Sequence, residues 1–150
     1  MPVIRFYSVS DELGQFSNFA PYPIELDGVM WPTSEHYFQA QKFLDATDRE
    51  AIRRAASPAI AAQLGRDRAR PLRGDWERVK LGVMREAVDA KFRQHADLRA
   101  LLLATGDAEL VEHTEHDRFW GDGGDGSGEN HLGRTLMGVR DSLRFGPRDE

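Results

Sequence analysis

The chain has 150 residues, no cysteine and a formal net charge of −5 at pH 7. This length suits one domain with a single hydrophobic core, and the lack of cysteine excludes disulfides and thiolate metal sites. The negative charge argues against non-specific binding to duplex nucleic acid, which requires a basic surface. Because no apolar run approaches the roughly 18 residues of a membrane helix and the first residues lack a signal-peptide hydrophobic region, we expect a soluble cytoplasmic protein with no membrane partner.

The N-terminal segment predicts a strand followed by a recognition loop. Residues 3–7 are rich in β-branched and aromatic side chains, as in a strand. After a polar turn, Phe16 and Phe19 bracket Ser17 and Asn18. If both aromatic rings anchor this loop in the core, the polar pair is held in place and can recognise a ligand. An ordinary structural loop with an Asx turn is the alternative.

Residues 24–31 give the clearest short-range signal in the chain. Apolar residues alternate on both sides of Asp27 and Gly28, and this dipeptide favours a two-residue β-hairpin because both positions tolerate positive φ. The hairpin leads through a proline into a helix. Thr33 or Ser34 can cap the first turn of this helix by accepting a backbone hydrogen bond.

The predicted central helix spans residues 33–44 and is apolar on more than one side. At about 100° per residue, Glu35, Gln39 and Lys42 share one stripe. The carboxylate and the amine are separated by roughly 10 Å of helix rise, so a sugar-sized ligand lying over Gln39 could contact both. A half-exposed amphipathic helix is the alternative interpretation.

Two short alanine-rich helices and an arginine-rich segment follow. The first helix, residues 47–55, opens with a capping box at Thr47. The second, residues 57–65, has Ser57 as its cap and a proline at its first position. Residues 66–74 contain four arginines, whose forks suit phosphate. This segment is therefore a candidate phosphate clamp, and the alternative is a solvated loop whose arginines pair with carboxylates.

The next part of the chain predicts a long helix, a core helix and a short strand. Asp75 can cap a helix from 76 to about 94, with Lys80 beside its apolar stripe. Residues 98–104 predict a core helix, and residues 109–113 alternate as a strand does.

Residues 119–130 are rich in glycine and acids and lead into a final helix. Such a loop can approach a ligand closely and offer backbone N–H groups to an anion. The loop lacks the Gly-Lys-Ser/Thr of a P-loop, and we predict no parallel strand-turn-helix unit around it, which a dinucleotide fingerprint requires. His113, His116 and His131 do not have zinc-site spacing, so we expect neither a metal nor a cofactor.

Four segments together resemble the YbiA-like, or NADAR, family. The resemblance is carried by Phe16-Ser17-Asn18-Phe19, the run from Trp31 to Phe43, Asp75-Trp76 with Lys80, and Trp120-Gly121-Asp122 onward to Leu132-Gly133 and Leu136-Met137. It spans nearly the whole chain. The block Trp-Pro-Thr-x-Glu-His-Tyr-Phe-Gln-Ala-Gln-Lys-Phe is long enough to be specific.

This resemblance implies an α+β fold: a single compact domain at residues 1–145, predominantly helical, with a small antiparallel sheet and an N-terminal hairpin, and a short tail at 146–150. It also implies an N-glycosidase that hydrolyses the ribosyl C–N bond of phosphorylated ribosylaminopyrimidine intermediates of riboflavin biosynthesis. The alternatives are removal of ADP-ribose from guanine in DNA and non-catalytic binding of NAD or ADP-ribose. The oligomeric state stays open.

Cleavage of a C–N bond at an anomeric carbon requires a negative charge near that carbon, a proton for the leaving nitrogen and a nucleophile. We predict that Glu35 supplies the negative charge and activates water, and that Asp122 is the second acid. A neutral Lys42 could instead attack the opened sugar as an amine, with Lys80 as its rival. The residues predicted to bind a small-molecule ribosyl or ADP-ribosyl substrate are Asn18, Phe19, Tyr37, Gln39, Arg66, Trp76, Trp120 and Gly121.

Overall fold

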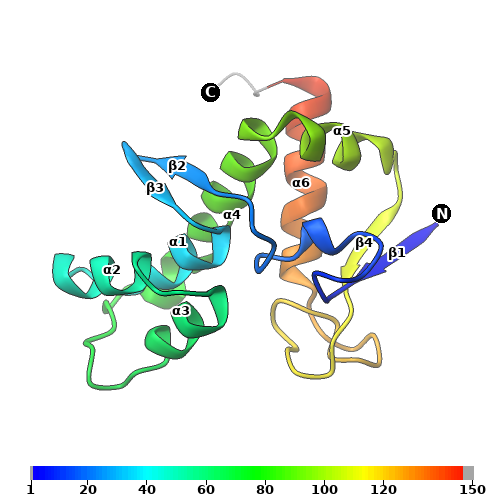
Figure 1. Cartoon of the computed structure of the whole chain (residues 1–150). Helices are drawn as coiled ribbons and strands as arrows, with labels where there is room; N and C mark the ends of the chain where they lie inside the picture. The colour runs from blue at the N-terminus through cyan, green and yellow to red at the C-terminus, as the bar shows by residue number, and fades with distance from the viewer. Residues whose placement is uncertain (1, 147–150) are drawn as a thin grey trace. The chain divides into compact units, whose positions relative to one another are not determined.

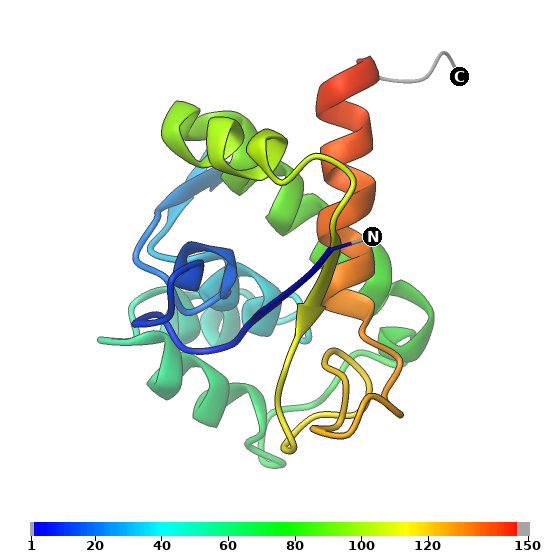
Figure 2. The same ribbon diagram turned by 90° about the vertical axis from the view of Figure 1, so that its right-hand side faces the viewer.

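A computed structural model describes residues 2–146 of the chain. Within these residues the chain forms six α-helices and two two-stranded sheets (Figure 1, and turned to the side in Figure 2). The expected α+β, mostly helical fold is therefore confirmed. The domain boundary at residue 145 stays a prediction: Gly146 follows the last helix, and residues 147–150 of the expected tail lie outside the described part.

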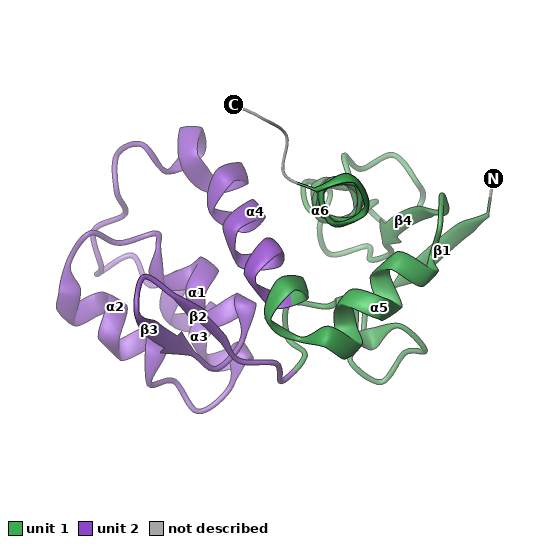
Figure 3. Cartoon of the chain, turned by 90° about the horizontal axis from the view of Figure 1, so that it is seen from above, with its two compact units in different colours: residues 1–20, 92–150 green, residues 21–91 purple. Residues whose placement is uncertain are grey.

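The chain divides into two compact units, coloured separately in Figure 3. Unit 1 comprises Met1–Ala20 and Phe92–Glu150, and unit 2 comprises Pro21–Lys91. No helix within residues 2–146 has both the length and the apolar character needed to cross a membrane. Each unit has its own two-stranded sheet.

Unit 2 opens with the predicted hairpin. Strands β2 (Ile24–Leu26) and β3 (Val29–Trp31) pair antiparallel, with Ile24 opposite Trp31. The turn residues Asp27 and Gly28 have φ values of 55° and 78°, the left-handed conformation that this dipeptide tolerates. The hairpin prediction is thus confirmed, including its position.

Helix α1 (Ser34–Ala40) begins as predicted, because the Thr33 side chain accepts a hydrogen bond from the His36 N–H. All seven of its residues are buried, so the half-exposed interpretation is wrong. The helix also ends at Ala40 rather than at residue 44. The cause is tertiary: the Arg73 N–H donates to the Lys42 carbonyl, and the Arg73 guanidinium donates to the Gln41 carbonyl.

Helices α2 (Ala46–Arg53) and α3 (Pro58–Gly65) pack against α1 and against each other (Figure 1). Ser57 caps α3 as predicted, by accepting from the Ile60 N–H. The predicted cap at Thr47 is wrong. Asp45 caps α2 instead, because its carboxylate accepts from two N–H groups of the first turn and also suits the positive end of the helix dipole.

Helix α4 (Trp76–Gln94) has the predicted bounds. Its buried residues fall at helical spacing, so its apolar stripe forms as the sequence indicates. They are Trp76, Val83, Met84, Ala87, Val88, Ala90, Lys91 and Phe92. Along the chain, α4 passes from unit 2 into unit 1 at residue 92.

Unit 1 contains a parallel strand pair that the sequence did not indicate. Strands β1 (Val3–Phe6) and β4 (Glu109–Glu112) pair in parallel, and α6 (His131–Phe145) packs against β4 (Figure 2). Helix α5 (Ala96–Ala104) packs against α6. Our expectation that no parallel strand-loop-helix unit surrounds the glycine-rich segment is therefore wrong, because β4 leads through that segment into α6.

Candidate functional site

A buried carboxylate with a fixed amide partner lies on α1. Glu35 and Gln39 are 8% and 7% exposed, and Gln39 Nε2 donates to Glu35 Oε2 at 2.8 Å. Their pairing depends on a glycine: a Cβ on Gly65 would lie 2.0 Å from Gln39 Oε1. The sequence predicted the stripe, but it marked Gly65 only as the end of a helix.

Lys42 lies just beyond the end of α1, in a partly buried position. Its Nζ is 3.5 Å from the Gly65 carbonyl oxygen and 6.0 Å from the centre of the Phe38 ring. Burial lowers the pKa of Lys42, the charge of Glu35 raises it, and the charges of Arg66 and Lys80 lower it further, so that the net direction is down. Lys42 therefore loses its proton more readily than an exposed lysine does.

An aromatic contact between α1 and α4 brings Lys80 near Glu35 and Lys42. The Phe38 ring packs on the Trp76 ring with centroids 5.1 Å apart, and Lys80 lies one helical turn after Trp76 on α4. Lys80 Nζ donates to Glu77 Oε1 at 2.6 Å. Unit 2 thus brings together Glu35 and the other predicted polar residues of this unit: Gln39, Lys42, Arg66 and Lys80.

Two predicted stacking residues of unit 2 lie in its core. Trp76 is 6% exposed and Tyr37 is 4% exposed. The Tyr37 ring packs edge-on against Trp31 at 5.4 Å, and burial, followed by the charge of Glu86, raises the pKa of its hydroxyl to about 12. Neither aromatic side chain exposes a broad face, so the geometry argues against their stacking on a base.

Two arginines of segment 66–74 have structural roles. Arg70 donates to Asp48 at 2.6 Å, and Arg73 donates to both carboxylate oxygens of Asp75 at 2.6 and 3.1 Å. For these residues the alternative of a carboxylate-paired loop is confirmed. Arg66, in contrast, is exposed.

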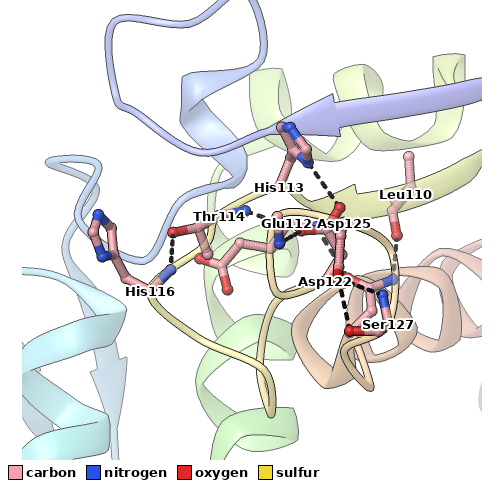
Figure 4. A network of polar contacts seen from close by, with 10 residues as sticks. Leu110, Glu112, His113, Thr114, His116, Asp122, Asp125 and Ser127 are labelled. Carbon is pink, nitrogen blue, oxygen red and sulfur yellow. Dashed lines mark hydrogen bonds and ion pairs between the residues drawn. The ribbon is translucent and has the colours of Figure 1, made fainter.

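A hydrogen-bond network around Asp122 organises the glycine-rich loop of unit 1 (Figure 4). Asp122 Oδ2 accepts from His113 Nδ1 at 2.7 Å, and Oδ1 accepts from the Gly124 and Thr114 N–H groups at 2.8 and 3.1 Å. Burial alone would raise the pKa of Asp122, but these hydrogen bonds together hold it below its ordinary value. This geometry favours an ionised carboxylate and argues against a proton donor. From the sequence, His113 was weighed only as a metal ligand, so its hydrogen bond to Asp122 was not predicted.

Most backbone N–H groups of the glycine-rich loop have acceptors within the protein. Internal carbonyl or carboxylate oxygens accept hydrogen bonds from the N–H groups of Asp122, Gly123, Gly124, Gly128, Glu129, Asn130, His131 and Leu132. The expected anion site at these N–H groups is therefore wrong. Gly121 is required for close packing, since a Cβ there would lie 2.8 Å from the Thr114 methyl and 2.9 Å from the Glu112 carbonyl oxygen.

The remaining predicted residues of unit 1 differ in exposure. Trp120 is partly exposed and packs edge-on against Phe119, with ring centroids 4.9 Å apart. Asn18 is 7% exposed, whereas Phe19 is 40% exposed. The expectation that both aromatic rings of the 16–19 loop are anchored in the core is thus wrong for Phe19, while Phe16, 1% exposed, does anchor it.

No group of three or more histidine and acidic side chains suited to a metal ion occurs among residues 2–146. His113, His116 and His131 have separate partners instead. His113 contacts Asp122, the His116 N–H donates to a threonine hydroxyl, and the His131 ring packs on Phe119 with centroids 4.4 Å apart.

Replacing Asp122 with asparagine is expected to lower the free energy of unfolding at pH 7 by about 1–3 kcal/mol, because a charge-assisted network is lost. The folded-state pKa of Asp122 lies below the ordinary 3.8. Its contribution is therefore complete above the unfolded-state pKa and is lost as the pH falls through the folded-state value. Urea unfolding between pH 7 and pH 2 should show the unfolding free energies of wild type and Asp122→Asn converging at the lowest pH. Asp141→Asn, at an exposed site, should match wild type throughout.

Comparisons with known proteins are consistent across nearly the whole chain. The family model described as NADAR domain matches residues 5–144. N-glycosidase YbiA of Escherichia coli (strain K12) is 64% identical over 141 residues, which cover 94% of this chain and 88% of that protein. N-glycosidase Npun_R5314 of Nostoc punctiforme is 51% identical, with 94% and 92% covered. The NMR structure of E. coli YbiA superimposes with a TM-score of 0.89 at 64% identity, over 95% of this chain and 85% of that one.

A longer protein also contains a similar segment. The riboflavin biosynthesis protein VVA0006 of Vibrio vulnificus is 48% identical over 141 residues, which cover 94% of this chain but 38% of that protein.

Proposed function

Because the chain belongs to the NADAR domain family, we propose that it is an N-glycosidase that hydrolyses the ribosyl C–N bond of a phosphorylated ribosylaminopyrimidine. Relatives with 64% and 51% identity over 94% of the chain are named N-glycosidases. The riboflavin-pathway substrate is supported by the name of the Vibrio vulnificus relative, which is 48% identical to this chain. The enzyme acts without a cofactor or a metal.

The observation that carries the proposal is the buried Glu35 carboxylate, held by Gln39 and close to the Lys42 amine. In the reaction, the C–N bond breaks and its electron pair goes to the leaving nitrogen, which takes up a proton from solvent. A water oxygen then forms the new bond to the anomeric carbon. Glu35 stabilises the positive charge that develops at this carbon and accepts a proton from the attacking water.

Lys42 is better placed than Lys80 for a role in the chemical step. Its amine is near Glu35, and its pKa is lowered mainly by burial. A neutral amine can attack the anomeric carbon of the ring-opened substrate and displace the leaving nitrogen as a free amine, and water then hydrolyses the resulting Schiff base. The Lys80 amine instead donates to the exposed Glu77 carboxylate at 2.6 Å.

The direct test compares two substrates. We expect the wild-type protein to release ribose 5-phosphate from a ribosylaminopyrimidine phosphate and to leave an ADP-ribosylated guanine in single-stranded DNA unchanged. Chromatographic detection of free ribose 5-phosphate and of free ADP-ribose measures both reactions in parallel. Turnover of the oligonucleotide alone would contradict the proposal and indicate a hydrolase acting on ADP-ribosylated DNA. Inactivity on both, with ADP-ribose still bound in calorimetry, would indicate a binding module.

A further inference from the structure

Three cationic side chains lie close together beside Glu35 in unit 2. Lys42 Nζ is 3.5 Å from the carbonyl oxygen of Gly65, the residue directly before Arg66. Lys80 approaches from α4, because the Phe38 ring is close to both Lys42 and Trp76 and Lys80 follows Trp76 by one helical turn. The charges of Arg66 and Lys80 both act on Lys42, which agrees with this placement.

The Glu77 carboxylate holds Lys80 only weakly. The three cations face Glu35, which acts on Lys42, and Glu77, which accepts from Lys80. The Glu77 side chain is 80% exposed whereas that of Lys80 is 16% exposed, so water weakens the attraction between them. Lys42 and Lys80 are therefore partly buried cations, and a phosphate can compete with Glu77 for Lys80.

The two partly buried arginines of segment 66–74, Arg70 and Arg73, have carboxylate partners of their own. Asp48 accepts from Arg70, and both carboxylate oxygens of Asp75 accept from Arg73. Their guanidinium groups hold the segment to α2 and to the end of α1. Arg66 is the arginine of this segment whose charge is shown to act on Lys42, and it is joined there by a lysine from another helix.

We propose that Arg66 and Lys80 bind the phosphate monoester of the sugar-phosphate substrate, next to the Glu35–Lys42 pair. This inference rests on the proposed N-glycosidase function. An arginine fork can donate two parallel hydrogen bonds to phosphate oxygens, and a lysine adds a compact charge. The dianion would draw Lys80 away from Glu77, so a neutral residue at position 77 should strengthen phosphate binding.

Calorimetry with ribose 5-phosphate and ribose tests this subsite without requiring turnover. Arg66→Gln and Lys80→Gln are each expected to weaken ribose 5-phosphate binding by about tenfold to a hundredfold, and to leave ribose binding unchanged. Glu77→Gln is expected to tighten ribose 5-phosphate binding by about two- to fivefold. The matched control is Arg78→Gln on the same helix, whose side chain is 80% exposed; it should behave as wild type.

Several results would overturn the assignment. Unchanged ribose 5-phosphate binding in Arg66→Gln would exclude Arg66 as a phosphate ligand. Equal weakening of ribose binding and ribose 5-phosphate binding would exclude a phosphate-specific role. Binding of ADP-ribose distinguishes a phosphate monoester from a diphosphate. If the substitutions weaken only the binding of ADP-ribose, the subsite binds a diphosphate and the monoester assignment is wrong. If wild type binds ribose 5-phosphate as predicted but hydrolyses no ribosylaminopyrimidine phosphate, the proposed function fails while the subsite stands.

Discussion

Glu35→Gln is expected to reduce kcat for hydrolysis of a ribosylaminopyrimidine phosphate by about 10³-fold, with little change in KM. Removal of a positioned general base typically costs about 10²- to 10⁴-fold, and a buried carboxylate also supplies charge stabilisation that a neutral amide lacks. An interaction made chiefly in the transition state affects kcat rather than substrate binding. Steady-state release of ribose 5-phosphate measures both parameters.

Glutamine at position 35 keeps the shape of the side chain and can still form a hydrogen bond with Gln39. The thermal unfolding midpoint of Glu35→Gln, measured in parallel, separates a loss of chemistry from a loss of folding, because the substitution also removes a negative charge beside Lys42. Glu109→Gln, at an exposed position of β4, is the matched control and should retain full activity. If Glu35→Gln kept more than about a tenth of wild-type kcat, acid–base catalysis by Glu35 would be untenable.

The elements that the sequence predicted well are those set by local signals. The Asp27-Gly28 turn determines the hairpin through its own backbone preferences, and Ser57 with the following proline starts α3. The apolar stripe of α4 is long enough for its period to be unambiguous. In each case a few neighbouring residues contain the needed information.

The errors arose where distant segments decide the outcome. Helix α1 stops at Ala40 because Arg73, more than 30 residues later, binds the next two carbonyl groups. The parallel pairing of β1 with β4 joins residues about 106 positions apart, which no short-range pattern encodes. Likewise, no local pattern indicates that His113 contacts Asp122.

In the candidate site, too, local signals predicted some of the residues and contacts between distant segments determined the others. Glu35 and Gln39 are about one turn apart on α1, so helical periodicity groups them, whereas Lys42 lies beyond the end of the helix. Gly65 and Lys80 join that group only through the packing of α3 and α4. Burial argues against a stacking role for two aromatic candidates. Trp76 and Tyr37 are residue types that can stack on a base, but their exposure is that of core residues.

The packing of α6 against β4 depends on the glycine at position 133. An ideal Cβ on Gly133 would lie 2.0 Å from the Leu110 carbonyl oxygen and 2.4 Å from Asn130 Nδ2. The Asn130 side chain joins the same two elements, since its Nδ2 donates to the Leu110 carbonyl at 2.9 Å and its Oδ1 accepts from the Glu112 N–H at 3.0 Å. A methyl group at position 133 would therefore displace backbone and break both hydrogen bonds.

Gly133→Ala should accordingly destabilise the protein by about 3 kcal/mol or more, the upper end of the usual cost of overpacking. The helix propensity of alanine, which favours it over glycine by about 1 kcal/mol, offsets only part of this. Gly82→Ala on α4 is the matched control, because a Cβ there meets no atom within 4 Å. It should stabilise the protein by about 0.5–1 kcal/mol. Urea unfolding of both variants measures the two changes, and equal stabilities would show that α6 can move away from β4 without loss.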